Sequence, residues 1–167
     1  MTDVLVAFAS RHGATEELAR AIGQQLSHSG LSVDVRPMNE VDSLQRYSAY
    51  VLGSAVYRGA WMPAAREFLE RHRRLLATKP TWLFSSGPIG EAPADETKAF
   101  DATEVVTAVH ARDHHLFGGK LDRHSLSLRE RLLTRLVRAQ DGDHRDWAIA
   151  AAWATAISHS LASRHAA

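Results

Sequence analysis

The sequence predicts an α/β protein built on one doubly wound sheet of five parallel strands, with helices on both faces in a three-layer arrangement. Apolar, strand-like runs alternate with amphipathic helical patterns through the first two thirds of the chain. Several of these runs are almost continuously apolar, as expected for parallel strands that are covered on both faces. Right-handed crossovers between such strands suit the strand order 2-1-3-4-5, which places a ligand crevice where the first and third strands diverge.

Five runs are typical of strands and four of helices. The predicted strands are Asp3–Ala9, Ser32–Arg36, Ala49–Ser54, Thr81–Ser85 and His114–Phe117. The predicted helices are Ala14–Ser27, Pro63–Leu76, Asp95–His110 and Asp146–Leu161.

Each predicted helix has an apolar stripe or a start signal at the expected place. Leu18 and Ile22 recur at helical spacing in the first helix, and Trp153 and Ile157 do so in the last. Pro63 suits the first helical position, because the N–H that proline lacks would have no partner there in any case.

The segment 120–141 interrupts the alternation and is predicted to be an insertion with its own helix at about 127–139. Leucines form the apolar stripe of that helix, and basic residues outnumber acidic ones. A solvated basic face is the simpler interpretation, and a weak contact with a membrane surface through residues 120–138 is the alternative.

Composition limits the class of protein. A chain of 167 residues with 45% apolar and 23% charged residues is expected to form a single domain over residues 1–167. The chain has no cysteine, which excludes disulfides and thiolate metal sites. No apolar run approaches the roughly 18 residues that span a bilayer. We therefore expect a cytoplasmic protein, at most peripheral to the membrane, with no nucleic-acid partner.

The histidines do not predict a metal site, although the chain has ten of them. His114 and His115 are adjacent on a predicted strand, so their side chains should point to opposite faces of the sheet and cannot chelate one ion together. No other pair has convincing ligand spacing, and we expect no bound metal.

The most informative stretch lies where the first strand ends and the first helix begins. It consists of Ser10, Arg11, His12, Gly13, Ala14 and Thr15. A tight, hydroxyl-bearing loop at a helix amino end binds phosphate, because free backbone N–H groups and the positive end of the helix dipole point at one spot. The loop lacks the glycine patterns of nucleotide triphosphate and dinucleotide sites. We therefore predict that it holds the phosphate of a different cofactor.

Two further loops follow the third and fourth predicted strands and should meet the first loop at the same edge of the sheet. Their candidate cofactor-binding residues are Ala55, Val56, Tyr57, Arg58, Gly59 and Trp61, followed by Ser86, Gly87 and Pro88. A flavin needs backbone polar groups for its ring edge and a flat wall for its ring face. Tyr57 and Trp61 are candidates for that wall, with ordinary core packing as the alternative.

These motifs resemble the flavodoxin-like superfamily, and within it the branch that contains menaquinone-dependent protoporphyrinogen oxidase. The matching stretches are residues 10–15 (SRHGAT), 52–59 (LGSAVYRG) and 67–72 (EFLERH). His12 stands where common flavodoxins have a threonine. The resemblance implies FMN as the cofactor, flavin-dependent oxidoreductase activity, and a small-molecule or quinone redox partner.

Other interpretations of the same motifs stay open. A flavodoxin-type one-electron carrier is one, although this protein, with a formal charge of +1, lacks the excess of acidic residues typical of such carriers. Residues 85–93 also contain no aromatic residue that could cover the second face of the flavin, which favours an open flavin face. A deazaflavin, F420, is the alternative cofactor, and a flavin-storing, flavin-sensing or receiver-like module is a further alternative. The sequence identifies no catalytic residue and no oligomeric state.

Overall fold

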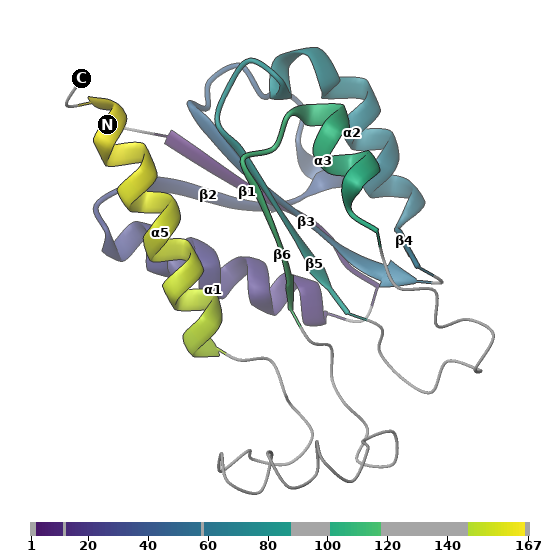
Figure 1. Ribbon diagram of the computed structural model, residues 1–167, viewed down its shortest axis with the longest axis horizontal. Coiled ribbons are helices and arrows are strands. Elements are labelled where there is room, and N and C mark those ends of the chain that lie inside the picture. The colour runs from purple at the N-terminus through teal and green to yellow at the C-terminus, as the bar shows by residue number, and fades with distance from the viewer. Residues whose placement is uncertain (1–2, 12, 58, 88–100, 118–146, 166–167) are drawn as a thin grey trace, which may run out of the picture.

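A sheet forms the middle layer of the computed structural model, which describes residues 3–11, 13–57, 59–87, 101–117 and 147–165 (Figure 1). The strands are β1 (Asp3–Ala9), β2 (Ser32–Pro37), β3 (Ala49–Tyr57), β4 (Ala60–Trp61), β5 (Thr81–Ser86) and β6 (Asp113–Phe117). The helices are α1 (Ala14–His28), α2 (Pro63–Leu76), α3 (Thr103–Val109) and α5 (Trp147–His165), with the short 3₁₀ helix η1 (Met38–Glu40).

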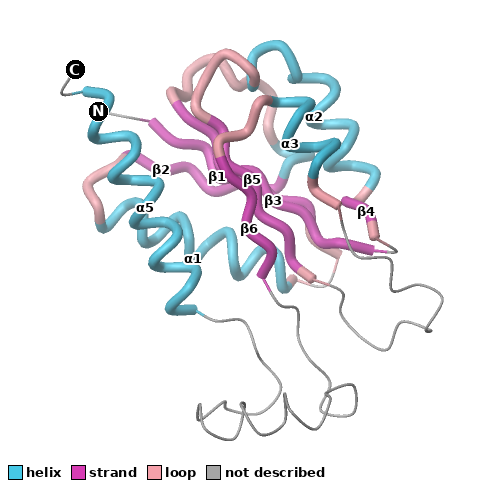
Figure 2. The backbone as a smooth tube through the Cα atoms, in the orientation of Figure 1, coloured by secondary structure: helices cyan, strands magenta, loops and turns pink. Residues whose placement is uncertain are grey.

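Five strands are parallel and lie in the order β2-β1-β3-β5-β6 (Figure 2). Counted along the chain without the short β4, this is the predicted order 2-1-3-4-5, so the doubly wound fold is confirmed. The register aligns the carboxyl ends of neighbouring strands, because Ala9 pairs with Ser54 and Ser54 pairs with Ser85.

The third strand and its continuation differ from the prediction. The sequence pattern ends this strand at Ser54, whereas β3 continues to Tyr57 and the chain then reverses, so that Tyr57 pairs with Ala60 of β4. Gly59 has a φ of 70°, a left-handed conformation that suits a tight hairpin. A strand of two residues is too short for side-chain alternation to predict it.

The helices follow the predicted bounds closely where the structure describes them. α2 has the predicted bounds, and α1 and α5 extend slightly beyond the predicted carboxyl ends. Of the predicted helix Asp95–His110, the structure shows Thr103–Val109, and residues 95–100 lie outside the described residues. The predicted insertion helix at about 127–139 also lies outside them.

Helices cover both faces of the sheet, which confirms the three-layer arrangement (Figure 1). On the α1–α5 face, the buried side chains of those two helices pack on Phe84 and other strand residues. On the α2–α3 face, Phe68 and Val109 belong to a second core that includes Leu52 of β3. Among the residues described, no helix combines the length and the apolar character needed to cross a bilayer.

The centre of the sheet depends on a glycine. A Cβ atom added to Gly53 of β3 would lie 2.1–2.4 Å from three ring carbons of Phe84 on β5. The Phe84 ring in turn packs edge-on against Phe117 and Trp153, with both centroid distances at 6.3 Å. The missing side chain at Gly53 therefore lets one aromatic ring join β3, β5, β6 and α5.

We expect Gly53→Ala to lower the free energy of unfolding by about 1–3 kcal/mol, because the added methyl group overpacks the core. Urea denaturation of the purified protein measures this loss. In a Phe84→Leu background, the same Gly53→Ala change should cost clearly less, because a smaller side chain leaves room for the methyl group. Equal costs in the two backgrounds would show that Phe84 is not what excludes a side chain at Gly53.

Candidate functional site

The carboxyl ends of β1, β3, β5 and β6 form one edge of the sheet, here called the carboxyl edge (Figure 2). Apolar strand residues give way there to hydroxyl-bearing side chains. Ser54, Ser85 and Ser86 are all fully buried at this edge, and Thr15 of α1 is buried close to the start of its helix. The three loops that the sequence singles out therefore converge on a polar region.

The first loop is organised by Ser10 and Gly13. The Oγ atom of Ser10 accepts the N–H of Gly13 at 3.0 Å, and Gly13 has a φ of 87°. That left-handed conformation favours glycine, although an added Cβ atom would meet nothing within 4 Å. Within the described residues, no side chain caps the amino end of α1. The carboxylate of Glu16 forms a 2.7 Å ion pair with Arg20, one turn further along the helix.

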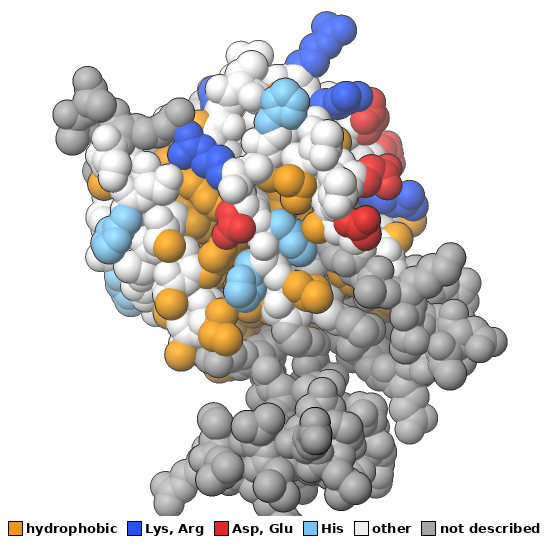
Figure 3. Space-filling model, viewed as in Figure 1, with side chains coloured by type: hydrophobic (Ala, Val, Ile, Leu, Met, Phe, Trp, Pro, Cys, Tyr) orange, Lys and Arg blue, Asp and Glu red, His pale blue; other side chains and the backbone are white. Residues whose placement is uncertain are grey.

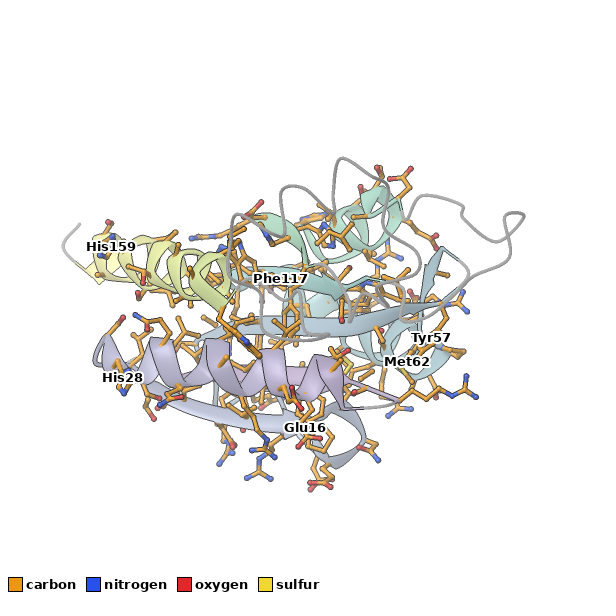
Figure 4. The ribbon with its side chains drawn as sticks, turned by 90° about the horizontal axis from the view of Figure 1, so that it is seen from below. Glu16, His28, Tyr57, Met62, Phe117 and His159 are labelled. Atoms are coloured by element: carbon orange, nitrogen blue, oxygen red, sulfur yellow. The ribbon has the colours of Figure 1, made fainter. Side chains whose placement is uncertain are left out.

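Three buried hydroxyl groups have no hydrogen-bond partner within the described structure. They belong to Thr15, Tyr57 and Ser86. Strand alternation places Ser86 on the same face as Phe84, the α1–α5 face, and Tyr57 on the face opposite Val56. Tyr57 lies at the end of the molecule where α1 begins (Figure 4). An unpaired buried hydroxyl costs about 1–3 kcal/mol, so three of them on one face favour a polar ligand there.

On the opposite face, the hydroxyl groups of Ser54 and Ser85 are used within the protein. Ser54 donates to the carbonyl of Ala55 at 2.8 Å and accepts the N–H of Met62 at 3.1 Å. Ser85 accepts the indole N–H of Trp61 at 2.7 Å. The two faces of the carboxyl edge are therefore chemically different, and the α1–α5 face is the one with unsatisfied polar groups.

The first and second predicted loops come together through Arg11 and Tyr57. The guanidinium carbon of exposed Arg11 lies 5.7 Å from the centroid of the half-buried Tyr57 ring, within the range of a cation–π contact. This contact joins a cationic side chain of the candidate phosphate loop to an aromatic ring. The predicted proximity of these two loops is thus seen directly.

The position of Trp61 differs from the expectation that it forms a wall for a flavin ring. Its side chain is only 2% exposed and belongs to the core of the α2–α3 face. Its indole N–H is also committed to Ser85. The β3–β4 hairpin turns the indole inward, and we therefore leave Trp61 out of the candidate wall and keep Tyr57.

Two other predicted site residues have partners within the protein. The N–H of Gly87 donates to the carbonyl of Phe117 at 2.7 Å. The side chain of Val56 points into the core of the α2–α3 face. The N–H of Gly87 is therefore bonded to β6, and the side chain of Val56 is part of the core.

The remaining predicted site residues lie at the carboxyl edge, in the β3–β4 hairpin or outside the described residues. Ala14 and Ala55 are buried at the carboxyl edge, and Gly59 lies in the β3–β4 hairpin. His12, Arg58 and Pro88 lie outside the described residues.

The predicted opposite orientation of the two strand histidines is confirmed. The Nε2 atom of His114 lies 2.7 Å from the Oγ atom of Ser85 on the α2–α3 face. The ring of His115 packs against Phe117 and Trp153 on the α1–α5 face. The described part of the chain contains no cluster of three side chains that could hold a metal ion. The contact of His114 with Ser85 was not predicted, because it depends on the register between two strands.

A separate polar pocket of about 230 Å³ lies beside β2 and has a different character. At its margin, one carboxylate oxygen of Asp34 accepts hydrogen bonds from Arg36, Arg46 and Tyr47, with distances of 2.6–2.7 Å. Glu40 adds a further negative charge to the lining. These charges compensate one another, so the pocket has no excess of cationic groups for an anion.

Comparison with known proteins agrees with this geometry. A family model described as a flavodoxin domain matches residues 5–147. Protoporphyrinogen IX dehydrogenase [quinone] from Escherichia coli strain K12 is 26% identical over 95 residues, which are 56% of this chain and 52% of that protein. The chain thus spans about half the length of the curated relatives that it matches.

Solved structures share the fold. A cysteine-to-serine mutant of flavodoxin from Pseudomonas aeruginosa is 16% identical, with a TM-score of 0.60 over 96% of this chain and 99% of that one. Flavodoxin 2 from Bacillus cereus is 23% identical, with a TM-score of 0.56 over 74% of this chain and 89% of that one. The rubredoxin oxygen:oxidoreductase of Desulfovibrio gigas is 15% identical, with a TM-score of 0.69 over 100% of this chain and 38% of that one.

At these identities the solved structures show the fold alone, and the family assignment comes from the family model. That model covers most of the chain, from β1 to the first residue of α5. The chain therefore belongs to the flavodoxin domain family, whose members bind FMN.

Proposed function

We propose that the protein is an FMN-dependent oxidoreductase whose cofactor binds at the carboxyl edge, on the α1–α5 face. The observation that carries this proposal is the trio of buried hydroxyls without partners, on Thr15, Tyr57 and Ser86. A folded protein keeps such groups at a cost of stability, and a ligand that bonds to them removes the cost. FMN carries a phosphate and a polar ring edge, which match donors of this kind.

The phosphate would bind at the amino end of α1. Thr15 would donate its unpartnered hydroxyl, and Ser10 has its own hydroxyl proton to donate while its oxygen accepts from Gly13. The amino end of α1 adds a positive partial charge, and Arg11 adds a full one. His12 would complete the loop as a further donor in place of the threonine of common flavodoxins.

The flavin ring would lie against the loops that follow β3 and β5. Tyr57 is the aromatic candidate for one ring face, and its partner Arg11 lies beside the same region. The ring would be bordered by Ser86 and Gly59 and by the neighbouring predicted residues Arg58 and Pro88. The flavin itself would supply the electron transfer, while these residues bind it, orient it and limit water access.

The similarity to a curated relative supports a proposal for the substrate class. Protoporphyrinogen IX dehydrogenase [quinone] oxidises its substrate with a quinone, as its name states. We infer a similar reaction here, in which a reduced small molecule gives up two electrons and a quinone or another acceptor receives them. A cytoplasmic location with peripheral contact at a membrane surface, through residues 120–138, would bring the protein to a quinone. A one-electron carrier and a deazaflavin cofactor are the competing proposals.

We expect Thr15→Val to weaken FMN binding by about 10- to 100-fold, because it removes one hydrogen bond to a charged phosphate. The same change should leave the free energy of unfolding of the FMN-free protein unchanged or higher, since the lost hydroxyl has no partner. Flavin fluorescence titration measures the first quantity, and urea denaturation measures the second.

Thr81→Val is the matched control for this substitution. Thr81 is also fully buried, but its hydroxyl lies within 3.0–3.1 Å of the carbonyls of Leu76 and Lys79, at the other end of β5. It should lower stability by about 1 kcal/mol without a specific effect on FMN affinity. Equal FMN affinity in Thr15→Val and the unchanged protein would remove α1 from the proposed phosphate site.

The proposed reaction class predicts how the FMN-loaded protein takes up electrons. Reductive titration followed by absorbance should show a single two-electron step, and protoporphyrinogen IX with a soluble menaquinone should yield fluorescent porphyrin faster than with free FMN. Thr15→Val at FMN concentrations below its dissociation constant serves as the control for both. Two well-separated one-electron steps with no acceleration of porphyrin formation would favour the carrier.

A further inference from the structure

A buried polar chain lies on the α2–α3 face of the carboxyl edge, opposite the proposed cofactor site. The indole Nε1 atom of Trp61 lies 2.7 Å from the Oγ atom of Ser85, and that Oγ atom lies 2.7 Å from the Nε2 atom of His114. Trp61 is 2% exposed and Ser85 is fully buried. A serine–histidine pair is a possible nucleophile and base, but Ser85 is inaccessible and its oxygen already accepts from Trp61.

The protons in this chain can be assigned from its chemistry. The indole nitrogen of Trp61 can only donate, so Ser85 accepts from it. The proton of the Ser85 hydroxyl then needs an acceptor, because Ser85 is wholly buried, and the Nε2 atom of neutral His114 lies at the right distance. Protonated His114 would instead bring a second donor to Ser85 and leave the serine proton without an acceptor.

This buried polar chain links three strands through its side chains. Trp61 belongs to β4, Ser85 to β5 and His114 to β6. β4 is only two residues long and pairs with the end of β3, where Tyr57 is paired with Ala60. The Trp61–Ser85 bond is therefore an anchor that holds the hairpin carrying Tyr57 against the sheet.

We propose that Ser85 and His114 are positioning residues, which hold the β3–β4 hairpin in place for the cofactor as long as His114 is neutral. This inference rests on the proposed FMN site, which it deepens by adding residues that touch neither cofactor nor substrate. It also makes cofactor retention sensitive to acid through a group on the opposite face of the sheet.

Burial, more than the surrounding charges, favours the neutral form of His114. Burial lowers the pKa of His114, the adjacent Asp113 opposes that effect, and His115 adds to it. β4 and β5 contain no titratable side chain, and α3 with its carboxyl cap contributes Glu104 and His110. Because the pKa of His114 lies below the ordinary value of about 6.5, its contribution to stability is complete above that pH and is lost as the pH falls.

The test compares His114→Gln with the unchanged protein between pH 7.5 and 5.5. A glutamine oxygen can accept the Ser85 proton and does not titrate. At pH 7.5 we expect both proteins to bind FMN equally, within about twofold. Toward pH 5.5 the unchanged protein should lose affinity several-fold more than His114→Gln and should also lose more of its unfolding free energy. The ionisation of the FMN phosphate near pH 6 affects both proteins alike.

Two further variants make the test specific. His115→Gln changes the neighbouring histidine on the opposite face and should keep the pH response of the unchanged protein. Ser85→Ala removes the link itself, and should weaken FMN binding at pH 7.5 and reduce the pH response. It replaces His114→Gln in the test if glutamine at position 114 is not tolerated. Parallel pH responses of FMN affinity in the unchanged protein and His114→Gln would overturn the positioning role alone. Failure of the unchanged protein to bind FMN at pH 7.5 would overturn the proposed function instead.

Discussion

The parallel sheet has to be covered on both faces, and this constraint determines where chemistry can occur in the protein. Crossovers between parallel strands place helices on each face, so the middle of every central strand lies in one of two cores. The contact of Phe84 with Gly53 shows that almost no free volume is left there. Buried serine side chains lie where β3 and β5 approach their carboxyl ends, and the carboxyl edge is consequently the place where a ligand can meet them.

The two faces of this edge have different roles because their hydroxyl groups have different partners. On the α2–α3 face, Ser54 and Ser85 are bonded within the protein and tie the β3–β4 hairpin to its surroundings. On the α1–α5 face, the hydroxyls of Thr15 and Ser86 are buried without partners in the described structure. In the proposed site, one face would support the hairpin, while the other would offer donors to a ligand at the expense of some stability.

The surface around the edge agrees with binding of an anionic group rather than with the steering of a basic protein partner. Exposed Arg11 stands over Tyr57 at the first loop, and the chain as a whole has a formal charge of +1. Away from the grey atoms, the face seen in Figure 3 is a mixture of cationic, acidic, histidine and apolar side chains without one dominant sign. Cofactor binding would therefore depend on local donors at the loop more than on a long-range field.

The sequence by itself determined the five parallel strands, their order and the loop at residues 10–15, because apolar periodicity and turn residues are local properties of the chain. It also placed His114 and His115 on opposite faces, since side chains alternate along any strand. Only the tertiary structure decided that Trp61 turns inward and that Gly87 is already bonded. Those outcomes depend on strand register: Ser85 lies 24 positions from Trp61 and 29 from His114. No local pattern specifies which of such distant side chains will meet in the folded protein.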